Sequence, residues 1–247
     1  MKIIVSPAKK MRQEDSLSYE GVPIFLEKTT LLMKGIQALS YEDAKALWKC
    51  NDKIATLNVE RFANMSLTEG LSPAILSYEG LQYQHMAPEV FDRKQLEWVQ
   101  EHLRILSGFY GVVRPLDGIV PYRLEMQAKG DFPNSTNLYD FWGKAIYQEI
   151  IHEDGVVLNL ASKEYSKCVE KYLTAEDRFI VCQFVELIDG KLKQKGTLAK
   201  MARGEMVRFL AESQGTAPED AKKFDKLGFV FAESYSTETN YVFIKKD

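Results

Sequence analysis

The sequence predicts a mixed α/β domain of the α+β kind, with a mixed sheet surrounded by helices. Short β-branched segments such as 3–5 and 156–158 alternate with stretches of helical periodicity, as in strands joined by helices. The pair Asp189-Gly190 lies between strand-like runs and indicates a hairpin, so antiparallel pairs are expected beside parallel ones. No repeat or long linker interrupts the chain, and residues 1–247 are therefore expected to form one compact domain that could be bilobed.

Helices are expected where apolar residues recur at helical spacing behind a capping residue. Ser40 precedes one such stretch, Asp92 precedes another that Gly108 ends, and Asn137 precedes a third. In order, the predicted elements are a strand at 3–5, helices near 26–39, 41–48, 93–107 and 138–150, a strand at 156–158, a hairpin over 179–192, a helix near 198–208, and a closing hairpin over 229–231 and 241–243.

Composition and charge exclude several classes of protein. With 45% hydrophobic and 27% charged residues, the chain is neither disordered nor fibrous, and a net charge of −3 argues against a histone-like polycation. The three cysteines are far apart and have no C-x-x-C spacing, which gives no support to a disulfide framework or a zinc site. No signal-peptide pattern and no apolar run of roughly 20 residues is present. We expect a cytoplasmic protein without membrane partner, metal or other cofactor, and a monomer is consistent with the sequence.

Four clusters of residues depart from this average, and the first follows the opening strand as Ser6-Pro7-Ala8-Lys9-Lys10. If Ser6 caps a helix with Pro7 at its first position, the two lysines lie near the positive end of a helix dipole, where cations cost about 0.3–1 kcal/mol. A bound phosphate would offset that cost. The alternative is a solvated lysine pair, and the glycines of a P-loop are missing.

The second cluster spans 103–126 and contains a Gly-x-x-Gly turn flanked by arginines. Glycine turns between short helices can present N–H groups to a DNA phosphate, as in a helix-hairpin-helix element. The usual signature has one residue between its glycines, whereas Phe109 and Tyr110 separate Gly108 from Gly111, so the match is partial. The alternative is that Gly108 simply ends a helix. The candidate DNA-contacting residues here are Arg104, Gly108, Tyr110, Gly111, Arg114 and Arg123.

The third cluster, 159–167, follows the predicted strand at 156–158. Polar side chains at the carboxyl end of a buried strand commonly form binding sites in α/β proteins. The alternative is structural, with Ser162 as the N-cap of a helix and Asn159 as a turn former.

The fourth cluster, 191–208, contains six basic residues and one acidic residue, which give it a local charge of +5. A helical projection places Lys200, Arg203 and Arg208 away from the apolar side of a helix. Charge runs are usually solvated faces, but a run this lopsided in an acidic protein is a candidate anion-binding surface.

Signatures of enzymes are scarce. The three histidines are isolated, and neither H-E-x-x-H nor G-x-S-x-G occurs. Glu125 could serve as a general base, and the alternative for this residue is a structural ion pair.

Several of these blocks, in this order, resemble the YaaA family of peroxide stress resistance proteins over nearly the whole chain. The blocks are IIVSPAK, LRILSGFYGVVRPLD, PYRLEM, NLYDFWG, VLNLASKEY and KMARG. The resemblance implies a cytoplasmic bacterial protein that protects against hydrogen peroxide by limiting free intracellular iron and hence DNA damage. It also implies a compact, unusual α/β fold with a positively charged cleft and a helix-hairpin-helix-like element for double-stranded DNA.

Carried over to this sequence, the resemblance makes Lys9, Lys10, Arg104 with the Gly108–Gly111 turn, Arg114, Arg123, Lys200 and Arg203 candidate cleft residues. The family's opening block often continues Ala-Lys-Thr, whereas this chain has Lys10 in place of the threonine. A hydroxyl role is therefore in doubt at this position, and the positive charge is higher.

Two functions of different classes are left open. The first is a stress protein that binds double-stranded DNA through phosphate contacts, largely without regard to sequence. The second is an enzyme that acts on a nucleotide or on damaged nucleic acid. Its phosphate would lie among Ser6, Lys9, Asn159, Ser162 and Tyr165, with Glu125 as acid or base. A deep pocket joining Lys9, Glu125 and Asn159 favours catalysis, and a long shallow basic groove favours binding.

Overall fold

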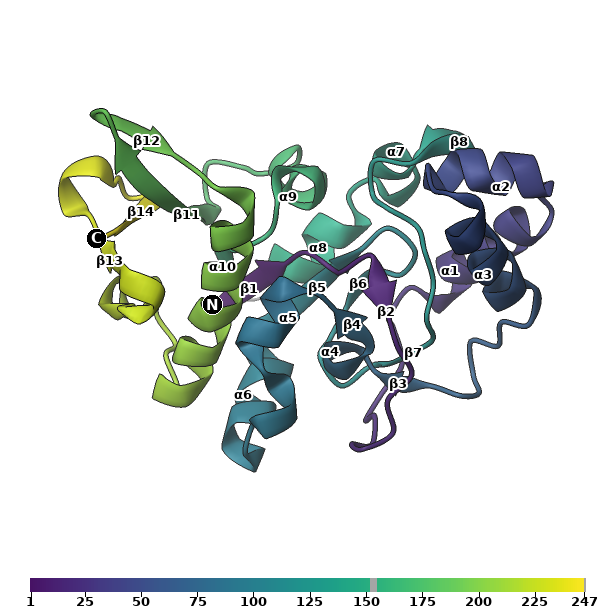
Figure 1. The fold of residues 1–247 in the computed structure, drawn as a ribbon, viewed down its shortest axis with the longest axis horizontal. Coiled ribbons are helices and arrows are strands. Elements are labelled where there is room, and N and C mark those ends of the chain that lie inside the picture. The colour runs from purple at the N-terminus through teal and green to yellow at the C-terminus, as the bar shows by residue number, and fades with distance from the viewer. Residues whose placement is uncertain (152–154, 247) are drawn as a thin grey trace.

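A mixed eight-stranded sheet forms the centre of the molecule (Figure 1). The computed structural model describes residues 1–151 and 155–246, so one of the three histidines, His152, lies outside the described residues. The strands follow the order β13-β14-β11-β10-β1-β5-β6, with β12 paired to β11 beside this path. The strands of the sheet are β1 (Lys2–Val5), β5 (Leu103–Ser107), β6 (Gly111–Val113), β10 (Val156–Asn159), β11 (Arg178–Ile188), β12 (Lys191–Lys193), β13 (Phe229–Phe231) and β14 (Asn240–Lys245).

The five inner strands are parallel, and an antiparallel strand closes each edge. The mixed sheet in one compact α/β domain confirms the predicted fold class. Both predicted hairpins are also confirmed, because β11 pairs with β12 and β13 pairs with β14 in antiparallel register.

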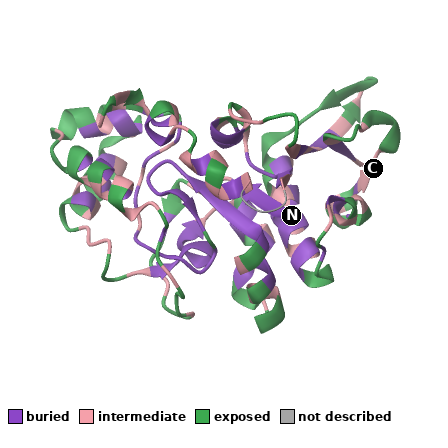
Figure 2. Cartoon of the chain, turned by 180° about the vertical axis from the view of Figure 1, so that it is seen from behind, coloured by how far each residue is buried: buried purple, intermediate pink, exposed green. Residues whose placement is uncertain are grey.

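Strand β1 lies buried in the middle of the sheet, between β10 and β5. Ile3, Ile4 and Val5 have no exposed surface, as expected for β-branched residues in a parallel sheet covered on both faces (Figure 2). The register sets Ile4 opposite Asn159 of β10 on one side and opposite Arg104 of β5 on the other.

The connections of the sheet diverge at β1 and β10. After β1 the chain crosses to β5 on one side, and after β10 it crosses to β11 on the other side. The carboxyl ends of two neighbouring parallel strands whose connections diverge form a crevice, which is the usual ligand site in open α/β sheets. The fold therefore contains a topological switch point directly after Val5 and Asn159.

Helices pack around the sheet and extend it along the long axis of the molecule, with α1, α2 and α3 gathered at one end (Figure 1). Several begin at the predicted caps: the side chains of Ser40, Asp92 and Asn137 accept hydrogen bonds from the main-chain N–H three residues later. The α-helices are α1 (Leu26–Gln37), α2 (Tyr41–Trp48), α3 (Asp52–Ala63), α4 (Ala74–Ser77), α5 (Leu81–Met86), α6 (Arg93–His102), α7 (Leu138–Trp142), α8 (Ala145–Ile151), α9 (Lys163–Glu170) and α10 (Gly196–Ser213).

Short elements complete the fold. Two-stranded pairs form between β2 (Lys10–Met11) and β4 (Tyr78–Glu79), β3 (Ser72–Pro73) and β7 (Gly118–Ile119), and β8 (Lys129–Phe132) and β9 (Ser135–Asn137). The 3₁₀ helices span Pro88–Val90, Pro218–Lys223, Lys226–Gly228 and Glu233–Tyr235. Within the described residues, none of the helices has the length and apolar character that a transmembrane segment requires.

The prediction for 93–107 was wrong in its second half. Helix α6 ends at His102, and residues 103–107 form β5 instead of continuing the helix. All five residues of β5 are buried, and a short apolar run of this kind fits a buried strand as well as a helix face. The Gly108–Gly111 turn consequently joins β5 to the antiparallel β6, so the helix-hairpin-helix-like element predicted there is not found.

Helix α10 packs closely against α5, and a glycine makes this approach possible. A Cβ added at Gly204 would lie 2.0 Å from the carbonyl oxygen of Gln82 and 2.9 Å from the main-chain nitrogen of Met86. Because main-chain atoms cannot move aside as a flexible side chain can, the helix-helix distance depends on this residue.

We expect Gly204→Ala to lower the free energy of unfolding by about 1–3 kcal/mol, because the added methyl group forces α5 and α10 apart. The matched control is Gly35→Ala within α1, where an added Cβ meets no atom within 4 Å. This control should raise the free energy of unfolding by about 0.5–1 kcal/mol, through helix propensity alone. Urea denaturation followed by circular dichroism measures both values. Equal effects of the two substitutions would contradict the close packing at Gly204.

Candidate functional site

A cleft of about 400 Å³ lies at the switch point. Its walls come from the segment after β1, the start of α5, the segment 122–125, the first turn of α9 and one side of α10. We call it the switch-point cleft. The charged residues that line it are Lys9, Lys10, Arg123, Lys200 and Arg203, together with Glu79, Glu125 and Glu164.

Two serines fasten the carboxyl ends of β1 and β10 at the base of the cleft. The main-chain N–H of Ser162 donates to Oγ of Ser6 at 2.8 Å, and the Ser6 hydroxyl donates to Oγ of Ser162 at 3.2 Å. The hydroxyl of Tyr83 donates to the Ser6 carbonyl at 3.0 Å and so ties α5 to the same point. Ser6 therefore acts as a hub between three walls of the cleft.

Of the two alternatives left open for the first cluster, the helix start at Ser6 is not found. No helix follows this serine; the chain runs without regular structure until Lys10 begins β2. The helix that starts at the cleft is α9, and its N-cap is Ser162, as in the structural alternative for the third cluster. The side chain of Ser162 makes no capping bond to α9, because it is engaged with Ser6.

Glu125 is the centre of an ion-pair group on one wall. Its Oε1 lies 3.1 Å from Nζ of Lys9 and 3.0 Å from Nη2 of Arg123. The side chains of Arg123 and Glu125 are only 12% and 14% exposed, whereas Lys9 is 63% exposed and its ion pair is correspondingly screened. The structural ion pair proposed as the alternative for Glu125 is thus present.

Glu164 also reaches the cleft, and the sequence reasoning missed it. Burial raises the pKa of its carboxyl group, and the negative charge of Glu125 raises it further, while a hydrogen bond from the main-chain N–H of Gln127 and the charge of Lys9 lower it. The only sequence signal was its place in the first turn of a helix, where acidic residues are common. Two carboxyl groups in one cleft, one with a raised pKa, can supply an acid and a base.

Arg203 lines the cleft from α10 and is partly buried. Its Nε is buried and, like that of Arg123, has no hydrogen-bond partner among the described residues, but Arg203 lacks the ion pair that Arg123 forms with Glu125. Burial lowers the pKa of this guanidinium, but an arginine stays charged in proteins. Lys200, one turn earlier on α10, is exposed and lines the same cleft.

The other predicted contacts lie elsewhere. Arg104 is buried, and its Nη1 donates to the main-chain carbonyls of Gln100, Glu101 and Leu103. Tyr110 is 1% exposed, and the Gly108–Gly111 turn around it is buried. Arg104 and this turn are therefore buried residues that do not line the switch-point cleft.

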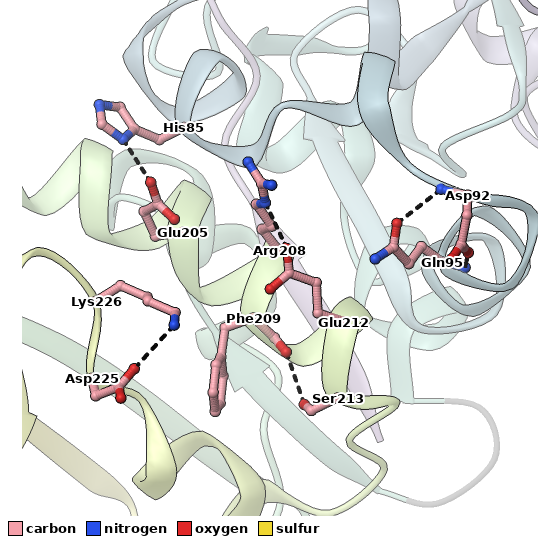
Figure 3. A network of polar contacts seen from close by, with 10 residues as sticks. All are labelled: His85, Asp92, Gln95, Glu205, Arg208, Phe209, Glu212, Ser213, Asp225 and Lys226. Atoms are coloured by element: carbon pink, nitrogen blue, oxygen red, sulfur yellow. Dashed lines mark hydrogen bonds and ion pairs between the residues drawn. The ribbon is translucent and has the colours of Figure 1, made fainter.

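Three further candidates also have partners outside the cleft. Arg114 pairs with Glu149, and Arg208 pairs with Glu212 on the outer side of α10 (Figure 3). Asn159 is buried, and its Oδ1 accepts a hydrogen bond from the main-chain N–H of Ala161. Of the predicted enzyme residues, Ser6, Lys9, Glu125, Ser162 and Tyr165 share the cleft, whereas Asn159 does not line it.

Burial raises the pKa of the Tyr165 hydroxyl well above its usual range, so this tyrosine stays protonated at neutral pH. Among the residues that the structure describes, no three His, Cys, Asp or Glu side chains are grouped to hold a metal ion.

The Ser6–Ser162 link predicts a specific stability effect. Ser6→Ala removes the acceptor of the Ser162 N–H and should lower the free energy of unfolding by about 0.5–1.5 kcal/mol. Ser162→Ala is the matched control, because it keeps this N–H and removes only the weaker hydroxyl contact at 3.2 Å. Chemical denaturation of both variants provides the comparison, and a larger loss in the Ser162 variant would count against Ser6 as the hub.

Glu164 predicts a pH dependence of stability. A carboxyl group whose pKa is raised by folding favours the folded state at low pH, and this contribution is lost as pH rises from its usual pKa of about 4.3 through the folded-state value. The wild-type protein should therefore be less stable than Glu164→Gln at pH 7, with a difference that shrinks toward pH 4. Urea denaturation across this range measures it, with exposed Glu176→Gln as the control. A difference that grows on acidification would show the opposite shift.

Comparison with known proteins identifies the family of the chain. The family described as "Peroxide stress protein YaaA" matches residues 1–235. A UPF0246 protein of Agathobacter rectalis is 53% identical over 247 residues, which is 100% of this chain and 99% of that protein. A UPF0246 protein of Lachnoclostridium phytofermentans is 52% identical over 246 residues, which is 99% of this chain and 96% of that protein. A UPF0246 protein of Pediococcus pentosaceus is 50% identical over 248 residues, which is 100% of this chain and 99% of that protein. The chain therefore belongs to the peroxide stress protein YaaA family.

Proposed function

We propose that this peroxide stress protein binds the phosphate backbone of double-stranded DNA in the switch-point cleft, largely without regard to sequence, and limits DNA damage in this way. One observation carries the proposal: five cations from three of the sequence clusters converge on one cleft of a protein whose net charge is −3. Phosphate contacts of this kind supply most of the affinity of sequence-independent DNA binding.

The basic surface extends beyond the cleft. The β11–β12 hairpin projects from the sheet (Figure 1). Lys191 and Lys193 on β12 are exposed, and so is Lys195, which follows this strand. Lys195 directly precedes α10, so the hairpin leads along the chain to Lys200 in the cleft. Lysines on flexible stems suit loose backbone contacts better than base reading.

The DNA proposal predicts that the affinity for DNA falls steeply as the salt concentration rises, and that Lys193 and Lys200 contribute to this dependence. The double variant Lys193→Glu/Lys200→Glu should bind every duplex more weakly, because each lost phosphate contact reduces the slope of log K against log salt by about 1. Fluorescence anisotropy with two unrelated duplexes, at several salt concentrations, measures affinity and slope.

The control Lys34→Glu/Lys53→Glu, with one exposed lysine on α1 and one on α3, makes the same charge change away from the cleft and should bind as wild type. The proposal fails if the wild-type protein binds no duplex at low salt, or if the Lys193/Lys200 double variant and the control behave alike.

We also propose that the protein limits free intracellular iron, and this part is supported by family membership alone. Direct sequestration would require a stoichiometric ferrous site. Anaerobic titration with ferrous iron tests for such a site: saturation at a whole-number ratio supports sequestration, and no saturable binding leaves an indirect effect on iron.

An enzyme acting on a nucleotide or on damaged nucleic acid is the second candidate, and one observation favours it. Glu125 and Glu164 share the cleft with Lys9, and the pKa of Glu164 is raised. This candidate predicts turnover of a phosphate-bearing substrate that Glu164→Gln abolishes while DNA affinity stays unchanged. Equal turnover by the wild-type protein and the Glu164→Gln variant would exclude Glu164 as the acid.

A further inference from the structure

We propose that the switch-point cleft holds a phosphate monoester, a terminal phosphoryl group carried either by a free nucleotide or by the end of a DNA strand. Arg203, Lys200 and the first turn of α9 form the site. The proposal deepens the DNA-binding function, because it assigns the same cleft a ligand that differs from the internal phosphates of a duplex.

Arg203 supplies the first argument. Arginines are rarely buried unless their charge is paired, because an unpaired buried charge is costly. Two other arginines near the sheet also have a buried Nε without a hydrogen-bond partner among the described residues, but the rest of each guanidinium group is engaged: Arg104 donates to three main-chain carbonyls, and Arg123 pairs with Glu125. Arg203 makes no hydrogen bond or ion pair with the described residues, yet its Nε is buried and its side chain lines the cleft. An anion in the cleft would supply the partner that the chain itself does not.

The start of α9 supplies the second argument. The first N–H groups of a helix have no acceptors within it and favour an anion at the helix end. Ser162 directs its hydroxyl to Ser6 instead of capping α9. Because Ser162, Glu164 and Tyr165 all line the cleft, this helix end faces the same space as Arg203.

The balance of charge distinguishes a monoester from a diester. Lys9 and Arg123 are both paired with Glu125, and Lys10 is paired with Glu79. Among the charged residues that line the cleft, Lys200 and Arg203 remain without a carboxylate partner, and Glu164 is the one acidic residue outside these ion pairs.

A phosphate monoester carries a charge of about −1.5 to −2 at pH 7, with a second pKa of about 6. An internal phosphodiester carries a single negative charge. Two cations and a helix end therefore favour the monoester. A volume of about 400 Å³ lies within the range of roughly 300–1,000 Å³ usual for small-molecule sites, so the cleft can accept a nucleotide.

The walls of the cleft also suit the rest of a nucleotide. Leu81, Tyr83, Tyr122 and Leu124 line it beside the charged groups. Apolar and aromatic surface next to a few placed polar groups is typical of ligand sites, and aromatic side chains accept any base by stacking.

The experiment compares three ligands on the full-length protein. They are a free nucleoside 5′-monophosphate, a nicked duplex with a 5′-phosphate at the nick, and the same duplex with a hydroxyl there. Calorimetry measures the nucleotide, and anisotropy measures the two duplexes. We expect the nucleotide to bind, or the phosphorylated nick to bind more tightly than the hydroxyl nick, and the stronger of the two ligands identifies the source of the monoester.

Two variants assign the site. Arg203→Gln should weaken binding of the phosphorylated ligand about tenfold, the effect expected for loss of one hydrogen bond between charged groups. Lys200→Gln, at an exposed position that cannot disturb folding, should weaken it in the same direction. Arg208→Gln is the matched control: it is on the same helix, is paired with Glu212 on the outer side, and should change nothing.

The outcomes separate this proposal from DNA binding itself. Equal affinity for both nicked duplexes, with no binding of the nucleotide, overturns the monoester site and leaves backbone binding standing. Binding of the nucleotide without binding of either duplex supports the monoester site and overturns the DNA-binding function. Loss of affinity in the Arg208 variant equal to that in the Arg203 variant would overturn the assignment to the cleft.

Discussion

The pairing of β1 with β10 on one side and β5 on the other is the constraint on which the rest of the structure depends. Four residues, all buried, occupy the centre of a parallel sheet and bring together segments that are about a hundred or more positions apart in sequence. Because the connections diverge at β1 and β10, their carboxyl ends must leave a crevice. The Ser6–Ser162 link closes the base of that crevice, and Gly204 sets the distance of the α5 and α10 walls.

The cleft concentrates charge that the net composition hides. Carboxylates neutralise part of the positive charge at the rim, where water and salt also weaken it. The Nε of Arg203 is buried, and a charge in such surroundings of low dielectric constant interacts more strongly with a ligand. An exposed lysine and a partly buried arginine on one helix therefore have different roles: long-range attraction of a polyanion for Lys200, and close contact for Arg203.

Much of this fold could be predicted from local patterns. Ser40, Asp92 and Asn137 cap helices because their side chains accept from nearby N–H groups, and Asp189-Gly190 turns a hairpin for reasons confined to a few residues. Residues 103–107 could not be assigned this way, since a buried strand beside β1 and a helix face show the same apolar run. Only the long-range pairing with residues 3–5 decides between them.

The candidate site could be predicted in part, because charged residues can be recognised from the local sequence. Lys9, Lys10, Arg123, Lys200 and Arg203 were found through charge, and all five line the cleft. Charge alone could not separate them from Arg104, which donates its hydrogen bonds to main-chain carbonyls, or from Arg208, which pairs with Glu212 on the outer side of its helix. Glu164 was missed because its unusual environment arises only from burial and from Glu125, which is 39 positions away in sequence.

The composition of the cleft walls couples ligand binding to the stability of the whole chain. Segments near residues 6–10, 79–83, 122–125, 162–165 and 200–203 contribute, and no contiguous fragment contains them all. A ligand of the cleft can therefore bind only the folded chain, and by mass action its binding must stabilise that state. At a concentration 100 times its dissociation constant, it would add about 2.7 kcal/mol to the free energy of unfolding. The melting temperature of the protein thus reports occupancy of the cleft, even for ligands whose chemistry is unknown in advance.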